Sequence, residues 1–98
     1  MKVTWAARAR TRLAELHDYV AQDSKSRALA MVERILDRAE TLLVAPRSGV
    51  RLQAFVDGEV RELLERPYRI IYRVSATGIA ILTVKHYCQR LIDRPEDF

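Results

Sequence analysis

The chain of 98 residues contains one cysteine, three prolines and three glycines. A single thiol cannot form a disulfide within the chain and cannot by itself build a zinc site. No apolar run approaches the roughly 18 residues that a membrane-spanning helix needs. No apolar segment typical of a secretory signal follows Met1. We therefore expect one domain spanning residues 1–98, in a reducing, cytoplasmic setting.

The charge of the chain is basic and unevenly distributed. Seventeen Lys and Arg against 13 Asp and Glu give a net charge of +4, and the only lysines are Lys2, Lys25 and Lys85. Arginine is preferred where a planar, bidentate contact with phosphate or carboxylate is made. Residues 61–90 hold six Lys or Arg and two acids, which equals the whole excess. This indicates an acidic partner (nucleic acid, ribosome or acidic protein segment), unless the charge only keeps the protein soluble.

The first half of the chain has helical periodicity. Within residues 6–22 the apolar side chains recur at Ala9, Leu13, Leu16 and Val20. A serine after Asp23 can cap a second helix, whose apolar positions are Ala28, Val32, Ile35, Ala39 and Leu42. This helix should end before Pro46. Because the connection is short, we expect an antiparallel helical hairpin.

The second half has the alternation of strands. Residues 60–64, 68–74 and 79–87 predict three strands, separated by turns at 66–67 and 75–78, and residues 2–5 predict a further one. In the middle strand Tyr68, Ile70, Tyr72 and Val74 should face the helices, and Arg69, Ile71 and Arg73 the other side. Residues 52–60 are less clear, although Asp57-Gly58 is a good turn pair. The predicted fold is α+β, with the helical hairpin packed on one face of a small, mainly antiparallel sheet.

The cations of the second half form a candidate binding face on the sheet. These residues are Arg61, Arg69, Arg73, Lys85 and Arg90. Arginines interleaved with Tyr and His suit phosphate contact and base stacking, and they also suit an acidic patch on a protein. The alternative is a solvated face on which arginine stems cover apolar side chains.

His86, Tyr87 and Arg69 are the candidates for catalysis. Cleavage of RNA by its 2′-hydroxyl needs a base, an acid and a cation beside the phosphate, and these three side chains supply such groups. Adjacent strand residues point to opposite faces, so His86 and Tyr87 act together only where the strand ends or bulges. No phosphate loop, dinucleotide fingerprint, metal-ligand spacing or nucleophile elbow is present. We therefore expect no cofactor and no metal.

Several segments, in the order in which they follow one another along the chain, resemble those of a known family. They are the N-terminal strand, the helical hairpin, Pro46-x-x-Gly49, Val60-Arg61-Glu62-Leu63, Tyr68-Arg69-Ile70-Ile71-Tyr72-Arg73-Val74, and Ile81-Leu82-Thr83-Val84-x-His86 followed by Arg90. With these, nearly the whole chain resembles the RelE/ParE superfamily of type II toxins. The resemblance implies a RelE/ParE-like fold and a small toxin neutralised by an antitoxin whose C-terminal segment wraps it. ParE-type members poison DNA gyrase, and RelE-type members cut mRNA on the ribosome.

Within the superfamily the strand run Tyr68–Val74 is more similar to the ParE type. The loop 47–51 holds arginines where RelE-type nucleases typically carry lysines, and no carboxylate lies between Pro46 and Gln53. The resemblance thus implies a gyrase inhibitor that arrests growth and forms a hetero-oligomer with a ParD-like antitoxin. That antitoxin should add a strand, or lay a helix in the groove between the helices and the sheet. The alternatives are a YoeB-like, ribosome-dependent endoribonuclease and a non-toxic, basic nucleic-acid-binding module.

Overall fold

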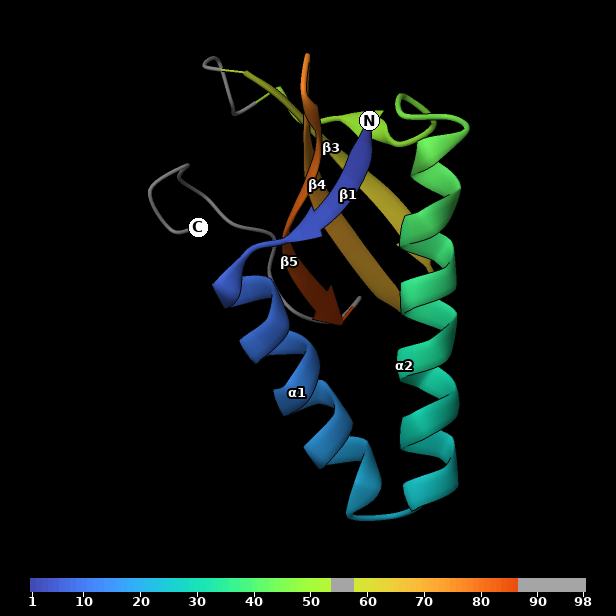
Figure 1. Ribbon diagram of the computed structural model, residues 1–98. Coiled ribbons are helices and arrows are strands. Elements are labelled where there is room, and N and C mark those ends of the chain that lie inside the picture. Colours follow the sequence, from blue (N-terminus) through green and yellow to red (C-terminus); the bar gives the residue numbers. More distant parts are fainter. Residues whose placement is uncertain (54–57, 87–98) are drawn as a thin grey trace.

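An N-terminal strand leads directly into the helical hairpin, and the remaining strands follow it. The computed structural model describes residues 1–53 and 58–86, and Figure 1 shows the arrangement. The elements are β1 (Lys2–Trp5), α1 (Ala7–Ala21), α2 (Lys25–Glu40), the 3-10 turn η1 (Thr41–Leu43), β2 (Val50–Arg51), β3 (Glu59–Glu65), β4 (Tyr68–Ser75) and β5 (Gly78–His86). The predicted α+β fold is confirmed.

The two helices begin and pack as their sequences predict. Ser24 caps α2, because its hydroxyl oxygen accepts a hydrogen bond from the backbone N–H of Arg27 at 3.2 Å. On α1, Ala9 is buried, and the other three positions of its apolar stripe pack against the core. Four of the five predicted positions of the second stripe are buried, and Val32 is half-buried. Met31 is also buried, although it was not predicted to be.

The strands form one five-stranded sheet in the order β1-β5-β4-β3-β2. β1 runs parallel to β5, and every other pairing is antiparallel. The additional strand expected at residues 2–5 is present, and it closes one edge. The two-residue strand β2 was not predicted. Of the expected turn pair, Asp57 lies outside the described residues, and Gly58 has a φ of 96°, which favours glycine.

Both faces of the sheet carry apolar residues. Tyr68, Ile70, Tyr72 and Val74 belong to the main core with the helices, as predicted. A second, smaller cluster lies on the opposite face. There Val60 and Ile71 are 0% exposed, and Leu52 and Leu82 pack against them. The centre of the sheet is therefore buried on the face away from the helices as well.

Strand β5 has one more residue than β4 across their pairing. Ile71 and Tyr72 are neighbours on β4, but their partners on β5, Thr83 and Ile81, are two positions apart. Leu82 is the additional residue of this β-bulge. As a result, Ile81 and Val84 both belong to the core on the helix side, although they are three positions apart. The bulge reverses the side on which the last residues of β5 lie.

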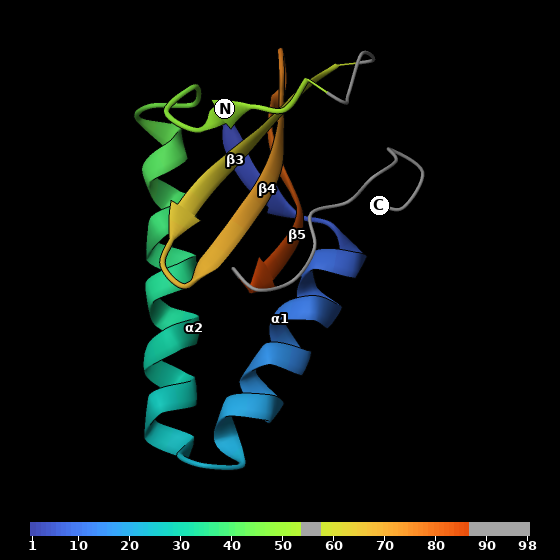
Figure 2. The same ribbon diagram turned by 180° about the vertical axis from the view of Figure 1, so that it is seen from behind.

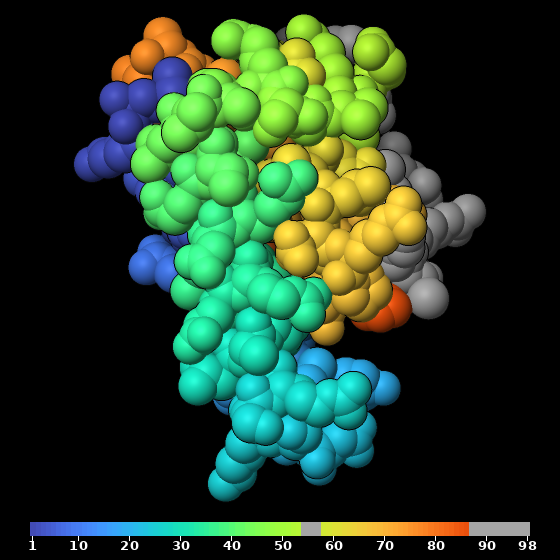
Figure 3. Space-filling view, turned by 90° about the vertical axis from the view of Figure 1, so that its right-hand side faces the viewer, coloured from blue at the N-terminus to red at the C-terminus, as the bar shows by residue number. Residues whose placement is uncertain are grey.

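The helical hairpin extends past the end of the sheet. The loop between α1 and α2 lies farthest from the strands in Figures 1 and 2, and Figure 3 shows it projecting from the body of the molecule. Within the described part of the chain, neither helix combines the length and the apolar composition needed to cross a membrane.

Candidate functional site

Three of the predicted cations share the face of the sheet that is turned away from the helices. Arg69 and Arg73 alternate with buried residues on β4, and Lys85 pairs directly with Arg69 across β4 and β5. Figure 2 shows the strands from this side. Arg73 is exposed, whereas the Arg69 Nε lies 3.3 Å from an Oε1 of Glu62. We call Arg69, Arg73 and Lys85 the open-face cations.

Arg61 does not belong to this group, and the prediction that it shares their face was wrong. Its partner on β4 is Tyr72, a residue of the core on the helix side. Paired residues of an antiparallel sheet point to the same face, so Arg61 also lies on the helix side. Arg90, the fifth member of the predicted face, lies outside the described residues.

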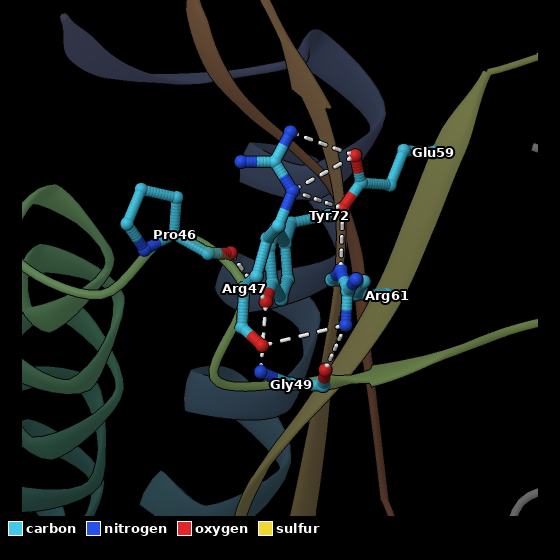
Figure 4. Close-up of polar contacts among 6 residues, drawn as sticks. All are labelled: Pro46, Arg47, Gly49, Glu59, Arg61 and Tyr72. Atoms are coloured by element: carbon cyan, nitrogen blue, oxygen red, sulfur yellow. Dashed lines mark hydrogen bonds and ion pairs between the residues drawn. The ribbon is translucent and has the colours of Figure 1, made fainter.

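On the helix side, Arg61 joins a cluster that fastens the turn after η1. Its Nε donates to Glu59 Oε2 at 2.6 Å, and its other donors reach the carbonyl oxygens of Gly49 at 2.7 Å and Arg47 at 3.4 Å. Glu59 also pairs with the Arg47 guanidinium at 2.9 Å (Figure 4). The hydrogen bonds from Arg61 and Arg47 hold the pKa of the Glu59 carboxyl below its ordinary value. This cluster is a structural support.

Tyr72 completes the same support from β4. Its hydroxyl donates to the carbonyl oxygen of Pro46 at 2.8 Å and accepts the backbone N–H of Gly49 at 3.0 Å. Burial raises the pKa of this phenol. A Cβ on Gly49 would lie 2.7 Å from the hydroxyl oxygen and 2.7 Å from the carbonyl oxygen of Glu62. Only glycine therefore fits at this close approach of the turn to the sheet.

The structure separates the residues that were candidates for catalysis. His86 pairs with Tyr68 at the end of β4, and their rings meet edge to face at 5.6 Å between centroids. Tyr68 belongs to the core on the helix side, whereas Arg69 points to the opposite face. The sheet itself thus lies between the Arg69 and His86 side chains. Tyr87 lies outside the described residues.

A groove lies beside His86, between α1 and the end of the sheet. Its volume is about 580 Å³, and it is lined by Arg12, Glu15, Leu16, Tyr19 and Val20 of α1 and by Tyr68, Val84 and His86. A second hollow of about 370 Å³ shares Tyr19, Val20 and Tyr68 with it and continues toward α2. Tyr19 is 73% exposed. The sequence reasoning missed this tyrosine as a site residue, although its place off the apolar stripe of the helix was a signal.

Comparison with known families decides the class of protein. The model of the family described as ParE toxin of type II toxin-antitoxin system, parDE, matches residues 3–90. The chain belongs to this family. It is thus a toxin of a type II toxin–antitoxin system, and the predicted membership of the RelE/ParE superfamily, closest to the ParE type, is confirmed.

Relatives of this ParE-family chain agree with the assignment. It is 34% identical over 89 residues to the protein of Sinorhizobium fredii (strain NBRC 101917 / NGR234) named "Putative toxin Y4kP", which covers 91% of each chain. A solved structure titled "Chromosomal ParDE TA system from P. aeruginosa" matches with a TM-score of 0.72 and 30% identity, over 88% of this chain and 95% of that one.

A second solved structure shares the fold. "The structure of YoeB dimer from Staphylococcus aureus" matches with a TM-score of 0.55 and 20% identity, over 88% of this chain and 95% of that one. At this identity the likeness concerns the fold alone. It supports the α+β architecture and carries nothing about activity.

Proposed function

We propose that this toxin inhibits DNA gyrase and thereby arrests growth, and that a cognate, ParD-like antitoxin neutralises it in a hetero-oligomer. The observation that carries the proposal is the match of the ParE toxin family to residues 3–90. The 30% identity to the structure titled as a ParDE system supports it. The DNA that gyrase handles is a polyanion, which is the kind of partner that a chain with a net charge of +4 attracts.

The open-face cations are the candidate contacts with this target. Arg73 is exposed on the face away from the helices, and Lys85 is half-buried there. Arg69 lies beside them, with Glu62 within ion-pair distance. Arginine and lysine on one strand pair give an array that can contact phosphates or carboxylates at neighbouring points.

The first test is a supercoiling assay with purified, antitoxin-free toxin and gyrase, including a measurement of trapped cleaved DNA. We expect inhibition with accumulation of cleaved DNA. The double variant Arg73→Glu, Lys85→Glu should weaken inhibition at least tenfold, because two attractive charges become repulsive. Arg27→Glu, on the exposed surface of α2, is the matched control. If folded wild-type toxin in large excess leaves gyrase active, the proposal fails.

The groove between α1 and the end of the sheet is the proposed antitoxin site. It combines apolar walls with an exposed aromatic, Tyr19, and the adjoining hollow is bordered by Arg27 and Arg34. An antitoxin segment with apolar anchors and acidic neighbours would match this surface, as in the docking of an amphipathic helix into a groove. Such a helix would cover the apolar walls and leave the open-face cations on the other side of the sheet.

The antitoxin site is tested by titrating the cognate antitoxin onto toxin variants. Tyr19→Asp should weaken binding at least tenfold, because it places a carboxylate on the apolar wall. Ala14→Asp adds the same charge on another exposed face of α1, outside both grooves, and should leave the affinity within a factor of two or so. Equal affinities for the two variants would place the antitoxin elsewhere.

The endoribonuclease alternative is tested with the same purified toxin. An RNase of this kind needs Arg69 and His86 around one phosphate, and the described structure places them on opposite faces of the sheet. We expect no cleavage of mRNA on programmed ribosomes. Cleavage that is lost in both Arg69→Ala and His86→Ala would favour the nuclease.

A further inference from the structure

Helix α2 and the turn after it expose a row of leucines. Leu29 is 56% exposed, Leu36 is 40% exposed and Leu43 of η1 is 41% exposed. They are spaced by seven residues, which is the repeat of a coiled-coil seam. None of the three lines either of the two grooves beside α1. We call Leu29, Leu36 and Leu43 the leucine stripe.

The charges of α2 are segregated around this stripe. Glu33 and Glu40 each lie four residues after a leucine of the stripe, so both fall on its outer flank, with Asp37 nearby. The arginines lie on the far side of the helix from the stripe, where Arg34 and Arg38 contact Glu65 of β3 at 3.3 and 3.8 Å. Figure 3 shows α2 against the strands on that side.

The acidic flank is not compensated within the part of the chain that the structure describes. Residues 1–53 and 58–86 place no cation within ion-pair distance of Glu33, Asp37 or Glu40. All three are exposed. In a chain with a net charge of +4, a row of apolar side chains thus runs beside carboxylates that a basic partner can reach.

We propose that the leucine stripe docks an amphipathic helix of another protein, with lysines or arginines of that helix facing Glu33 and Glu40. The seven-residue spacing suits a helix that packs along α2 at a small crossing angle. Apolar contact supplies the affinity, and the acidic flank selects the charge of the partner. The groove proposed for the antitoxin would bind acidic side chains, whereas this site would bind basic ones. The inference depends on neither gyrase nor the ribosome being the target of the toxin.

A second copy of this chain fits the stripe poorly. In an antiparallel pair of stripes, the flank of Glu33 and Glu40 would meet the same flank of the other copy, which opposes like charges. In a parallel pair it would meet the positions of Ile35 and Leu42, which are 0% exposed in the core of their own subunit. The charges and the burial thus favour a partner of different sequence.

The test uses two synthetic helical peptides of about three heptads, with leucine at the a and d positions. One carries lysine at the flanking e and g positions, and the other carries glutamate there. Titrated against folded toxin by fluorescence anisotropy, the lysine peptide should bind at least tenfold more tightly. The double variant Glu33→Lys, Glu40→Lys should reverse this preference. Equal binding of the two peptides to the wild type would overturn the proposal.

Single variants locate the binding on the stripe. Leu36→Gln should weaken binding of the lysine peptide at least tenfold, as expected for a central apolar contact. Leu64→Gln is the matched control, because Leu64 is 37% exposed on β3, and it should change nothing. Circular dichroism confirms that both variants fold. Retained affinity in Leu36→Gln, or self-association of the wild type that Leu36→Gln abolishes, would refute a docking site for a basic helix.

Discussion

Tyr68 and His86 face each other across β4 and β5 with their ring planes at 88°, whereas Arg69, the next residue of β4, points to the other side of the sheet. The histidine therefore belongs to the wall of the groove next to α1. The arginine belongs to the open-face cations and lies beside Glu62. One step along a strand thus divides the basic and aromatic residues between two surfaces, which can serve two partners.

His86→Ala tests whether this histidine has a structural role. We expect the free energy of unfolding to fall by about 0.5–1.5 kcal/mol through loss of the edge-to-face contact. Gyrase inhibition by the folded variant should remain within about threefold of the wild type, a difference of less than 1 kcal/mol. His86→Phe keeps the ring and is the control for the contact. Loss of toxicity in both variants, with the fold intact, would instead assign the imidazole a chemical role.

Tyr72→Phe tests the attachment of the turn at residues 46–49. The variant removes a hydroxyl that accepts a hydrogen bond from the Gly49 N–H and donates one to the Pro46 carbonyl oxygen. Leaving these groups without their partner should cost about 1–3 kcal/mol in urea unfolding. Tyr68→Phe is the matched control, with an expected change below about 0.5 kcal/mol. Equal effects of the two substitutions would contradict the role of the Tyr72 hydroxyl.

Glu59→Gln tests the pH dependence of stability. The pKa of Glu59 is lowered in the folded state from its ordinary value of 4.5, mainly by hydrogen bonds from Arg61 and then Arg47. A lowered pKa stabilises the folded state above 4.5, and this contribution is lost as the pH falls through the folded-state value. The wild type should be more stable than Glu59→Gln at neutral pH, and the gap should narrow below 4.5.

The control for this pH series is Glu33→Gln, which removes an exposed carboxyl outside the cluster. Comparing the two variants at each pH separates the effect of the Glu59 hydrogen bonds from the general effect of one fewer carboxyl. A gap between Glu59→Gln and the wild type that widens on acidification would show the linkage to have the opposite sign.

Deletion of Leu82 tests the bulge. Without this residue β5 alternates regularly, and Thr83 and Ile81 can still pair with Ile71 and Tyr72. We expect the variant to fold, with a loss of about 1–2 kcal/mol for the half-buried leucine. Deletion of Ile71, in the regular strand β4, should prevent folding, because it turns a run of core side chains to the wrong face. Chemical denaturation measures both.

If removal of Leu82 unfolds the protein, the bulge itself is required. The expected tolerance follows from the faces on which the residues lie. Deletion of Leu82 removes one side chain from the open face, and Ile81 and Val84 keep their places on the helix side. In a variant that folds, amide exchange of β5 shows whether the strand retains its protection.

Local sequence was enough to predict the helices and most of the strands. The spacing of Ala9, Leu13 and Leu16 allows one buried helical face, and Ser24 marks the start of the next helix. The alternation of residues 68–74 places Arg69 and Arg73 on the side opposite the core. The family resemblance followed from the same residues, since these patterns and their order define the fold.

The grouping of the functional side chains depended on the tertiary structure. Residues 79–84 are apolar on both faces of the strand, so their pattern does not indicate where the alternation changes phase; packing against β4 placed the bulge at Leu82. The face on which Arg61 lies depended on its pairing with Tyr72. The sequence of residues 60–64 does not decide it, because Val60 and Leu64 fall on one face of the strand and Leu63 on the other. The sequence alone thus determined the two helices, the four longer strands and which residues are basic. Pairing between strands decided which of those residues share a surface, because a shift of one residue in register exchanges the two faces.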